Sequence, residues 1–202
     1  MKTIIQIGSH VGNTINDPIF NTINPDDKLI LVEPVPYLFR KLKENYKNKN
    51  LNNVYFINKA VSDFIGEIEL TIPSERNDFS RFPHWASQLA SVDRMHVHHH
   101  IGNLIAERIL VPTTTISEII HEYDVKEIDF LNTDTEGHDY TILMDYDFKI
   151  KPKKILFEHK HMDGFGTVGK NYETLMKRLE SLGYVFKEKT IEDTCVELNM
   201  SV

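Results

Sequence analysis

The sequence predicts an α/β fold with a doubly wound, mostly parallel sheet of seven strands that finishes in an antiparallel hairpin. Three observations predict it. Short apolar runs alternate along the chain with longer stretches of helical periodicity. The runs are nearly continuous in apolar residues, as in parallel strands covered on both faces. The last two runs leave no room for a helix between them, so they should pair antiparallel at one edge of the sheet.

The predicted strands are the apolar runs at 3–8, 28–34, 53–61, 127–134, 153–159, 183–190 and 194–200. Helices are predicted at 13–23, 34–48, 114–123 and 171–183. Pro18 implies that the first helix begins near it or bends there. In the second, Leu38, Leu42 and Tyr46 recur at helical spacing. Gly183 is placed to end the fourth helix.

Residues 62–112 interrupt this alternation. The segment SDFIGEIELTIP (62–73) indicates an inserted hairpin with Gly66 in its turn, and the histidine-rich stretch after it has no clear period. Connections of this length are often functional loops or lids. Phe82 and Trp85 fit two interpretations: a wall for a methyl acceptor or other ligand, or anchors that hold the loop on the core.

The composition is typical of one soluble domain over residues 1–202, with 41% hydrophobic and 26% charged residues. The formal net charge of −7 argues against a nucleic-acid partner bound mainly through phosphates. The longest apolar runs have about five residues, against the roughly 20 that a membrane-spanning helix needs. With no apolar signal region at the N-terminus and Cys195 as the only cysteine, we expect a cytoplasmic protein without intrachain disulfides or membrane association.

A glycine loop follows the first predicted strand. In IGSHVGNT, Gly8 and Gly12 frame a loop, and glycines let a backbone turn sharply and approach a ligand. Glu33 ends the second strand at the same sheet edge, where ligands of open parallel sheets bind and where a carboxylate can accept hydrogen bonds from ribose hydroxyls. The alternative interpretation is that no ligand binds here, that the glycines only allow a turn, and that Glu33 is an acid exposed to solvent.

The loop excludes two common nucleotide motifs. His10 stands where the dinucleotide fingerprint G-x-G-x-x-G has its second glycine, and the Gly-Lys-Ser/Thr of a P-loop is absent. A glycine loop, a ribose-binding acid and further acids at Asp134 and Glu136 remain. A negative pocket without a phosphate cradle suits a cationic nucleoside, so the sequence favours S-adenosylmethionine as cofactor. An enzyme that uses a nicotinamide cofactor is an alternative.

These segments resemble the FkbM family of S-adenosylmethionine-dependent methyltransferases, which has the Rossmann-like class I methyltransferase fold. The matching segments are IIQIGSHVGNT, LILVEP, NKAVSDFIGEIELTI, VPTTTISEII and IDFLNTDTEGHDYTIL, the last with the family's D-x-E-G block. The resemblance implies a single methyltransferase domain that transfers a methyl group to a hydroxyl oxygen, with a sugar or related small molecule as acceptor. The oligomeric state is left open.

The resemblance also implies residue roles. They are Gly8, Ser9 and Gly12 at the methionine end of the cofactor, Glu33 at the ribose, Ala60 and Val61 near the adenine, and Ser87 and Asp134 beside the cofactor. The sequence departs from the family pattern at three positions: Gln6 replaces an aspartate, Asn132 a lysine and Asp139 a glutamate. On these departures, a methyltransferase-like binding protein without catalysis stays an alternative.

Methyl transfer to oxygen needs alignment of the reactants, exclusion of water and a group that accepts the hydroxyl proton. Asp134 and Glu136, at the end of a predicted central strand, are candidate catalytic residues. His159 is a third candidate because an imidazole titrates near neutral pH. Glu136 or Asp139 fits a second interpretation, as an acid that caps or begins the following helix.

The histidines raise the question of a metal. His96, His98, His99 and His100 crowd one predicted loop, and His159 and His161 would share one face of a strand. No H-E-x-x-H or cysteine-rich spacing is present, so surface or lid histidines are the favoured interpretation and no metal ligand is assigned. A divalent ion that clamps a diol acceptor, or a histidine/carboxylate metal-dependent enzyme, remains open.

Overall fold

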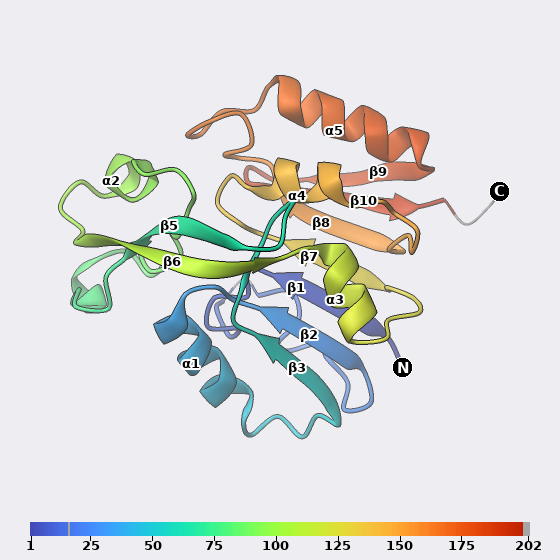
Figure 1. Ribbon diagram of the computed structural model, residues 1–202, viewed down its shortest axis with the longest axis horizontal. Helices are drawn as coiled ribbons and strands as arrows, with labels where there is room; N and C mark the ends of the chain where they lie inside the picture. Colours follow the sequence, from blue (N-terminus) through green and yellow to red (C-terminus); the bar gives the residue numbers. More distant parts are fainter. Residues whose placement is uncertain (16, 200–202) are drawn as a thin grey trace.

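The computed structural model describes residues 1–15 and 17–199 and contains a large sheet and a small one (Figure 1). The large sheet has seven strands in the order β3-β2-β1-β7-β8-β10-β9. Its strands are β1 (Thr3–Ile7), β2 (Lys28–Val32), β3 (Asn53–Ile57), β7 (Phe130–Thr133), β8 (Lys154–Glu158), β9 (Tyr184–Lys189) and β10 (Asp193–Leu198). The first five are parallel, and β10 is antiparallel to both neighbours, which confirms the predicted fold class.

The strand order reverses at β1. The chain passes from β1 to β2 and β3 on one side, then returns to β7 and β8 on the other. Ile7, the last residue of β1, pairs with Val32 of β2 and with Thr133 of β7, so the carboxyl ends of all three strands are level. Ligands of open α/β sheets bind at such a reversal.

The alternation of side chains along the strands gives the large sheet two apolar faces. Ile5 and Ile7 pack on one face with residues of helices α3 (Ile116–Glu122), α4 (Asp139–Asp145) and α5 (Lys170–Ser181). Ile4 faces the other way and packs with Leu42 and Tyr46 of α1 (Pro36–Tyr46). Each fully buried side chain of this size contributes roughly 1.5–3 kcal/mol. The sheet is therefore covered on both sides, as a doubly wound fold requires.

Three of the predicted helices are confirmed as α1, α3 and α5. Gly183, with φ +95°, follows the C-terminal end of α5. The prediction of a helix at 13–23 is wrong, because the described residues there form turns. The carboxylate of Asp17 accepts hydrogen bonds from the N–H groups of Ile19 and Phe20 at 2.9 and 2.6 Å, which caps a single turn that ends where buried Ile19 enters the core.

The small sheet has the order β4-β6-β5, with strands β4 (Ala60–Val61), β6 (Ala106–Thr114) and β5 (Glu67–Pro73). The predicted strand 53–61 is thus two strands in two sheets. They separate near Asn58, whose amide donates to the carbonyl oxygens of Glu33 and Pro34. The predicted local hairpin with Gly66 in its turn is also wrong. β5 pairs antiparallel with the distant β6, because buried Leu70 packs there against Val111.

Residues 74–105, which we call the insert, connect β5 to β6. They carry a 3-10 helix (Phe79–Arg81) and α2 (His96–His100). The insert has its own buried cluster, Ala86, Leu89, Val97 and Leu104, with Phe82 and Trp85 packed against it. The two aromatic side chains therefore anchor the insert, which was one of their two interpretations. None of the helices within the described residues combines the length and the apolar character needed to cross a bilayer.

Candidate functional site

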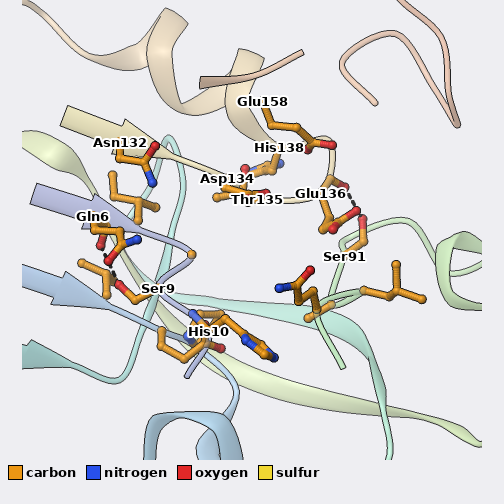
Figure 2. A pocket seen from close by; sticks show the side chains of 18 of the residues that line it. Gln6, Ser9, His10, Ser91, Asn132, Asp134, Thr135, Glu136, His138 and Glu158 are labelled. Carbon is orange, nitrogen blue, oxygen red and sulfur yellow. Dashed lines mark hydrogen bonds between the residues drawn. The ribbon is translucent and has the colours of Figure 1, made fainter. Parts of the chain in front are cut away.

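A cavity of about 430 Å³ lies at the carboxyl ends of β1, β2, β7 and β8, where the strand order reverses (Figure 2). Its volume is within the range of small-molecule sites. Lining side chains come from these strand ends and from the insert, which contributes Trp85, Gln88 and Ser91. The insert therefore forms one wall of the cavity, and Trp85 lines this wall as well as anchoring the insert.

The glycine loop closes tightly on the neighbouring strand ends. Gly8 has φ +78°, and a Cβ atom there would lie 1.8 Å from the carbonyl oxygen of Asp134. The N–H groups of Gly8 and Ser9 both donate to the carbonyl oxygen of Val32 at 3.0 Å. Gly12 has φ +73° but does not line the cavity, since a Cβ there would meet the side chain of Leu42 in α1 at 2.4 Å. Gly12 instead lets the loop pack on α1.

Glu33 is held in one orientation by the backbone. Its Oε2 accepts from the N–H of His10 and its Oε1 from the N–H of Val35, both at 2.8 Å. Burial raises the pKa of the Glu33 carboxyl to about 8, although both N–H donors act to lower it. Each oxygen keeps a further lone pair for a ligand hydroxyl. Ala60 and Val61, predicted to lie near an adenine, line the same cavity.

His10 is a site residue that sequence reasoning considered only because it breaks the G-x-G-x-x-G pattern. It has φ +49°, lines the cavity, and places its Nε2 2.9 Å from the Oγ of Ser87. Ser87 itself is not among the lining residues. It contacts the glycine loop through His10, so any effect of Ser87 on a cofactor is indirect. Burial lowers the pKa of His10 to about 4.

Asp134, Glu136 and Glu158 bring three carboxyl groups to the cavity wall (Figure 2). Burial raises the pKa of Glu158 well above its usual range, and the neighbouring acids raise it further. Loss of surrounding water inside the cavity and the charges of Glu136 and Asp139 also raise the pKa of Asp134, although that residue is partly open to solvent. Burial also raises the pKa of Glu136 to about 8. The cavity therefore disfavours uncompensated negative charge, and a cationic ligand would favour ionisation of these acids.

Asp139 has a different role from these acids. It is fully buried, and its Oδ2 accepts from both the N–H and the Oγ1 of Thr135, at 3.1 and 2.6 Å. It therefore stabilises the turn that leads into α4, as the helix-start interpretation expected. Glu136 does not take that role. Its backbone has φ +52°, an uncommon conformation for glutamate that is found often at functional sites.

His159 does not reach the cavity. Its Nδ1 lies 3.1 Å from the Oγ1 of Thr194, and its ring centre lies 5.3 Å from that of Tyr172 in α5. Glu158 faces the cavity, and the next residue points to the opposite side, since side chains alternate along extended chain. His159, a candidate proton acceptor, is therefore not among the residues that line the cavity, and it lies outside the cluster of possible metal ligands that includes His161.

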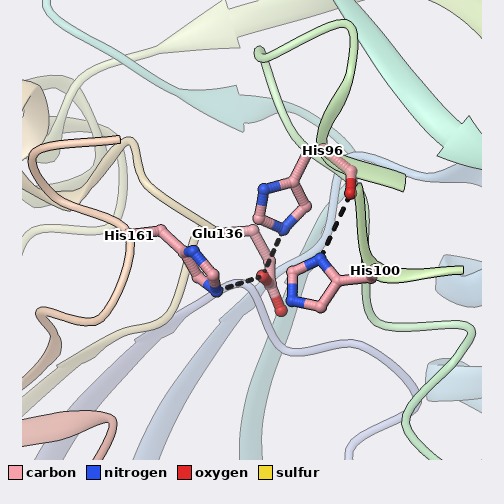
Figure 3. A group of neighbouring side chains, drawn as sticks. All are labelled: His96, His100, Glu136 and His161. Carbon is pink, nitrogen blue, oxygen red and sulfur yellow. Dashed lines mark hydrogen bonds and ion pairs between the residues drawn. The ribbon is translucent and has the colours of Figure 1, made fainter. Parts of the chain in front are cut away.

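His161 instead meets two histidines of the insert. The donor atoms of His96, His100, Glu136 and His161 all lie within 4.8 Å of one another (Figure 3). The insert histidines sit on helix α2 and not in the irregular loop that was predicted. His98 and His99 of the same helix are exposed. In the sequence, the i, i+4 spacing of His96 and His100 was the available indication that the two side chains could meet. Glu136 and His161 are far from them in sequence, so the full group could not be recognised.

The departures from the family pattern at Gln6 and Asn132 also lie in the cavity wall. The amide nitrogen of Gln6 donates to Oδ2 of Asp17 at 2.8 Å. Asp17, which sequence reasoning did not single out, therefore brings a carboxylate next to the position where the family has one. The Oε1 of Gln6 is buried and has no hydrogen-bond partner among residues 1–15 and 17–199.

Comparisons with known proteins identify the family of the chain and agree with its fold. The family model described as Methyltransferase FkbM domain matches residues 6–186. The FkbM methyltransferase from Methylobacillus flagellatus KT has a similar structure, with a TM-score of 0.55 and 13% identity over 98% of this chain and 43% of that chain. A putative caffeoyl-CoA O-methyltransferase from Staphylococcus aureus gives a TM-score of 0.51 and 12% identity over 98% of this chain and 76% of that chain. Among curated proteins there is no match.

Proposed function

The chain belongs to the FkbM methyltransferase family, and we propose that it transfers a methyl group from S-adenosylmethionine to a hydroxyl oxygen of a small molecule, a sugar or a related compound. One observation carries the proposal. Glu33, oriented by two backbone N–H groups, faces the cavity at the reversal point of the sheet, beside the loop of Gly8 and Ser9. Ligands of open α/β sheets bind at this point, and a carboxylate there can form hydrogen bonds with the hydroxyls of a ribose.

The lining residues fit S-adenosylmethionine. Glu33 would accept hydrogen bonds from the ribose hydroxyls, with Ala60 and Val61 beside the adenine. The unpartnered Oε1 of Gln6 is an acceptor suited to the amino group of the cofactor. The carboxyl group of Asp134, which is on the cavity wall and open to solvent, would lie beside the sulfonium, whose positive charge favours the ionised carboxylate. When bound, the cofactor supplies the transferable methyl group.

The remaining part of the cavity is suited to the acceptor. Glu136 and Glu158 line it from the strand ends, and Trp85 lines it from the insert. An aromatic face beside carboxyl groups is suited to the apolar face and the hydroxyls of a sugar ring. In the protein without a bound metal ion, the fraction of Glu136 that is ionised can accept a hydroxyl proton, and the insert would exclude water.

Calorimetric titration of the purified protein with S-adenosylmethionine tests the cofactor, with NAD as the control. We expect binding in the micromolar range, roughly −8 kcal/mol, and no heat with NAD. A screen of hydroxylated acceptors with isotope-labelled methyl donor would then test transfer to oxygen. Absence of S-adenosylmethionine binding would overturn the proposal and favour a binding protein that has lost catalysis. Binding without transfer to any hydroxyl would overturn the acceptor class alone.

A further inference from the structure

We propose that His96, His100, Glu136 and His161 form a binding site for zinc or a similar transition-metal ion at the acceptor side of the cavity. Their donor atoms all lie within 4.8 Å of one another (Figure 3). In a tetrahedral zinc site, ligand distances of about 2.1 Å place the donor atoms about 3.4 Å apart. Small movements of these side chains would therefore bring the four donor atoms to the spacing of a tetrahedral zinc site. Three imidazoles and one carboxylate suit zinc and its neighbours better than magnesium or calcium.

Helix α2 supplies two of the ligands already oriented. His96 and His100 are four residues apart, so they project from the same side of the helix, and their ring centres are 4.6 Å apart. The Nδ1 of His100 lies 3.2 Å from the carbonyl oxygen of His96 and donates to it. This leaves the Nε2 lone pair of His100 for the ion. A backbone carbonyl on the other ring nitrogen is the usual way in which proteins orient a metal-binding histidine.

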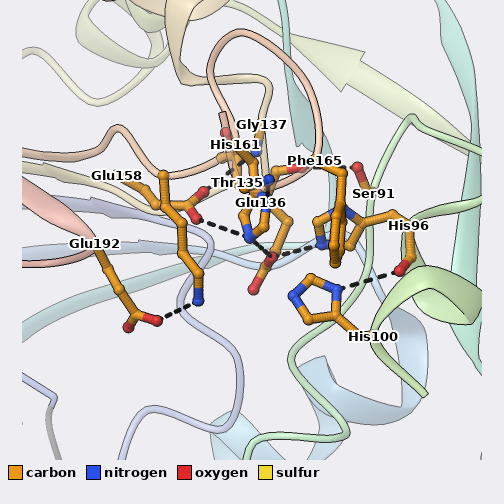
Figure 4. Close-up of polar contacts among 12 residues, drawn as sticks. Ser91, His96, His100, Thr135, Glu136, Gly137, Glu158, His161, Phe165 and Glu192 are labelled. Atoms are coloured by element: carbon orange, nitrogen blue, oxygen red, sulfur yellow. Dashed lines mark hydrogen bonds and ion pairs between the residues drawn. The ribbon is translucent and has the colours of Figure 1, made fainter. Parts of the chain in front are cut away.

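His161 provides an independent indication of a ligand. Its side chain is 2% exposed, and its Nε2 has no hydrogen-bond partner in the part of the chain that the structure describes. That nitrogen lies 3.8 Å from Oε2 of Glu136 and 3.7 Å from Oε1 of Glu158 (Figure 4). Both distances are too long for a hydrogen bond. They match the spacing of two ligands that share one ion, so a cation between them would satisfy all three groups.

The ion would take the place of a proton. Nε2 of His96 and Oε2 of Glu136 are 2.6 Å apart and share a hydrogen bond, so both can bind one metal only after that proton leaves. In His161, the N–H of Gly166 donates to Nδ1 at 2.9 Å, so the ring proton is on Nε2. Coordination through Nε2 moves this proton to Nδ1, and the amide of Gly166 must turn away. Gly164 and Gly166 have positive φ, and nothing lies within 4 Å of where a Cβ on either residue would be, so crowding at these two positions does not oppose the turn.

The site would join three separate segments. His96 and His100 belong to the insert, Glu136 follows β7, and His161 follows β8. The ring of Phe165 packs edge to face with that of His100, with 4.6 Å between the ring centres (Figure 4). A bound ion would therefore fix the insert against the strand ends. This inference stands on the cluster alone and does not depend on methyl transfer.

Metal binding can be measured on untagged protein that has been freed of metal by dialysis against a chelator and then returned to zinc. We expect one equivalent of zinc by elemental analysis and titration calorimetry, and a melting temperature that rises with zinc concentration. The metal-free protein should bind cobalt with the intense visible bands of a four-coordinate ion. The amide of Gly166 should also exchange with solvent faster once the metal is bound.

The decisive variant is His100→Ala, because within residues 1–15 and 17–199 the side chain of His100 forms a hydrogen bond only to its own helix. Loss of a residue that only orients a metal ligand weakens metal binding roughly 10–100-fold. Loss of the ligand His100 itself should weaken zinc binding by more than that. The matched control, His98→Ala, removes an exposed histidine from the same helix and should bind like the wild type. Equal melting temperatures in chelator would show that both variants fold. Absence of a stoichiometric ion, or equal loss in both variants, would overturn the metal site, whatever the result with S-adenosylmethionine.

Discussion

Substitution of Glu33 by glutamine tests the cofactor site through its pH dependence. If Glu33 accepts hydrogen bonds from ribose hydroxyls, the ligand favours the ionised carboxylate, and binding displaces a proton wherever Glu33 is protonated in the free protein. Its pKa of about 8, raised by burial, places this transition near neutral pH. Affinity of the wild type for S-adenosylmethionine should therefore rise as the pH increases through 8.

The magnitude follows from proton linkage. With a pKa of about 8, roughly one tenth of Glu33 is ionised at pH 7 and nearly all of it at pH 9, which makes binding about tenfold tighter at pH 9. Hydrogen bonds to a charged group contribute about 1.5–3 kcal/mol, so Glu33→Gln should weaken binding at pH 9 by about 10- to 100-fold. At pH 7 the penalty should be about tenfold smaller.

Calorimetric titrations of wild type and Glu33→Gln at both pH values give the required ratio of dissociation constants. The cofactor's own amino group titrates in this range, but its effect cancels between the two proteins. Glu67→Gln is the matched control, because Glu67 is exposed on β5 and its substitution should change neither affinity nor pH dependence. A ratio between wild type and Glu33→Gln that is the same at pH 7 and pH 9 would refute the reasoning.

The same pKa shift predicts a change in stability with pH. Between about 4.5 and 8, the folded protein holds a proton on Glu33 that the unfolded chain has lost. The free energy of unfolding should therefore fall as the pH rises through this window, and Glu33→Gln should remove that part of the slope. Chemical denaturation at several pH values measures it, and identical slopes in the two proteins would contradict the shift.

Four further substitutions test the site. Asp134→Asn should lower turnover at least tenfold while the melting temperature changes little, and wild-type turnover would remove Asp134 from the reaction. Gly8→Ala should prevent stable folding, because the added Cβ would overlap the backbone carbonyl oxygen of Asp134. Gly12→Ala should cost less, because its Cβ would meet side-chain atoms of Leu42 and Tyr46 and no backbone. Thermal denaturation compares the two variants. His159→Gln should leave turnover within about twofold of the wild type, because His159 contacts Thr194 outside the cavity; a large loss would contradict its placement.

The order of strands and helices could be read from the sequence because the evidence for it is local. Apolar runs such as that of β1 and the periodicity of α1 depend on neighbours in the chain. The rules of parallel sheets then bring Gly8, Glu33 and Asp134 to one edge, and the structure places all three in the cavity. The helix predicted at 13–23 was wrong, which shows the limit of local patterns. Hydrogen bonds from two backbone N–H groups to the carboxylate of Asp17 stabilise a turn there.

Only the tertiary structure decided which residues meet across long distances in sequence. Periodicity cannot show that β5 pairs with β6 beyond the insert, because each strand buries its apolar side chains against whichever partner the fold supplies. Nor can it show that His161 faces the cavity while His159 faces α5, because this depends on where β8 ends and how the chain turns after it. The grouping of His96, His100, Glu136 and His161 requires three segments to meet in space, and contacts formed only on folding bring them together.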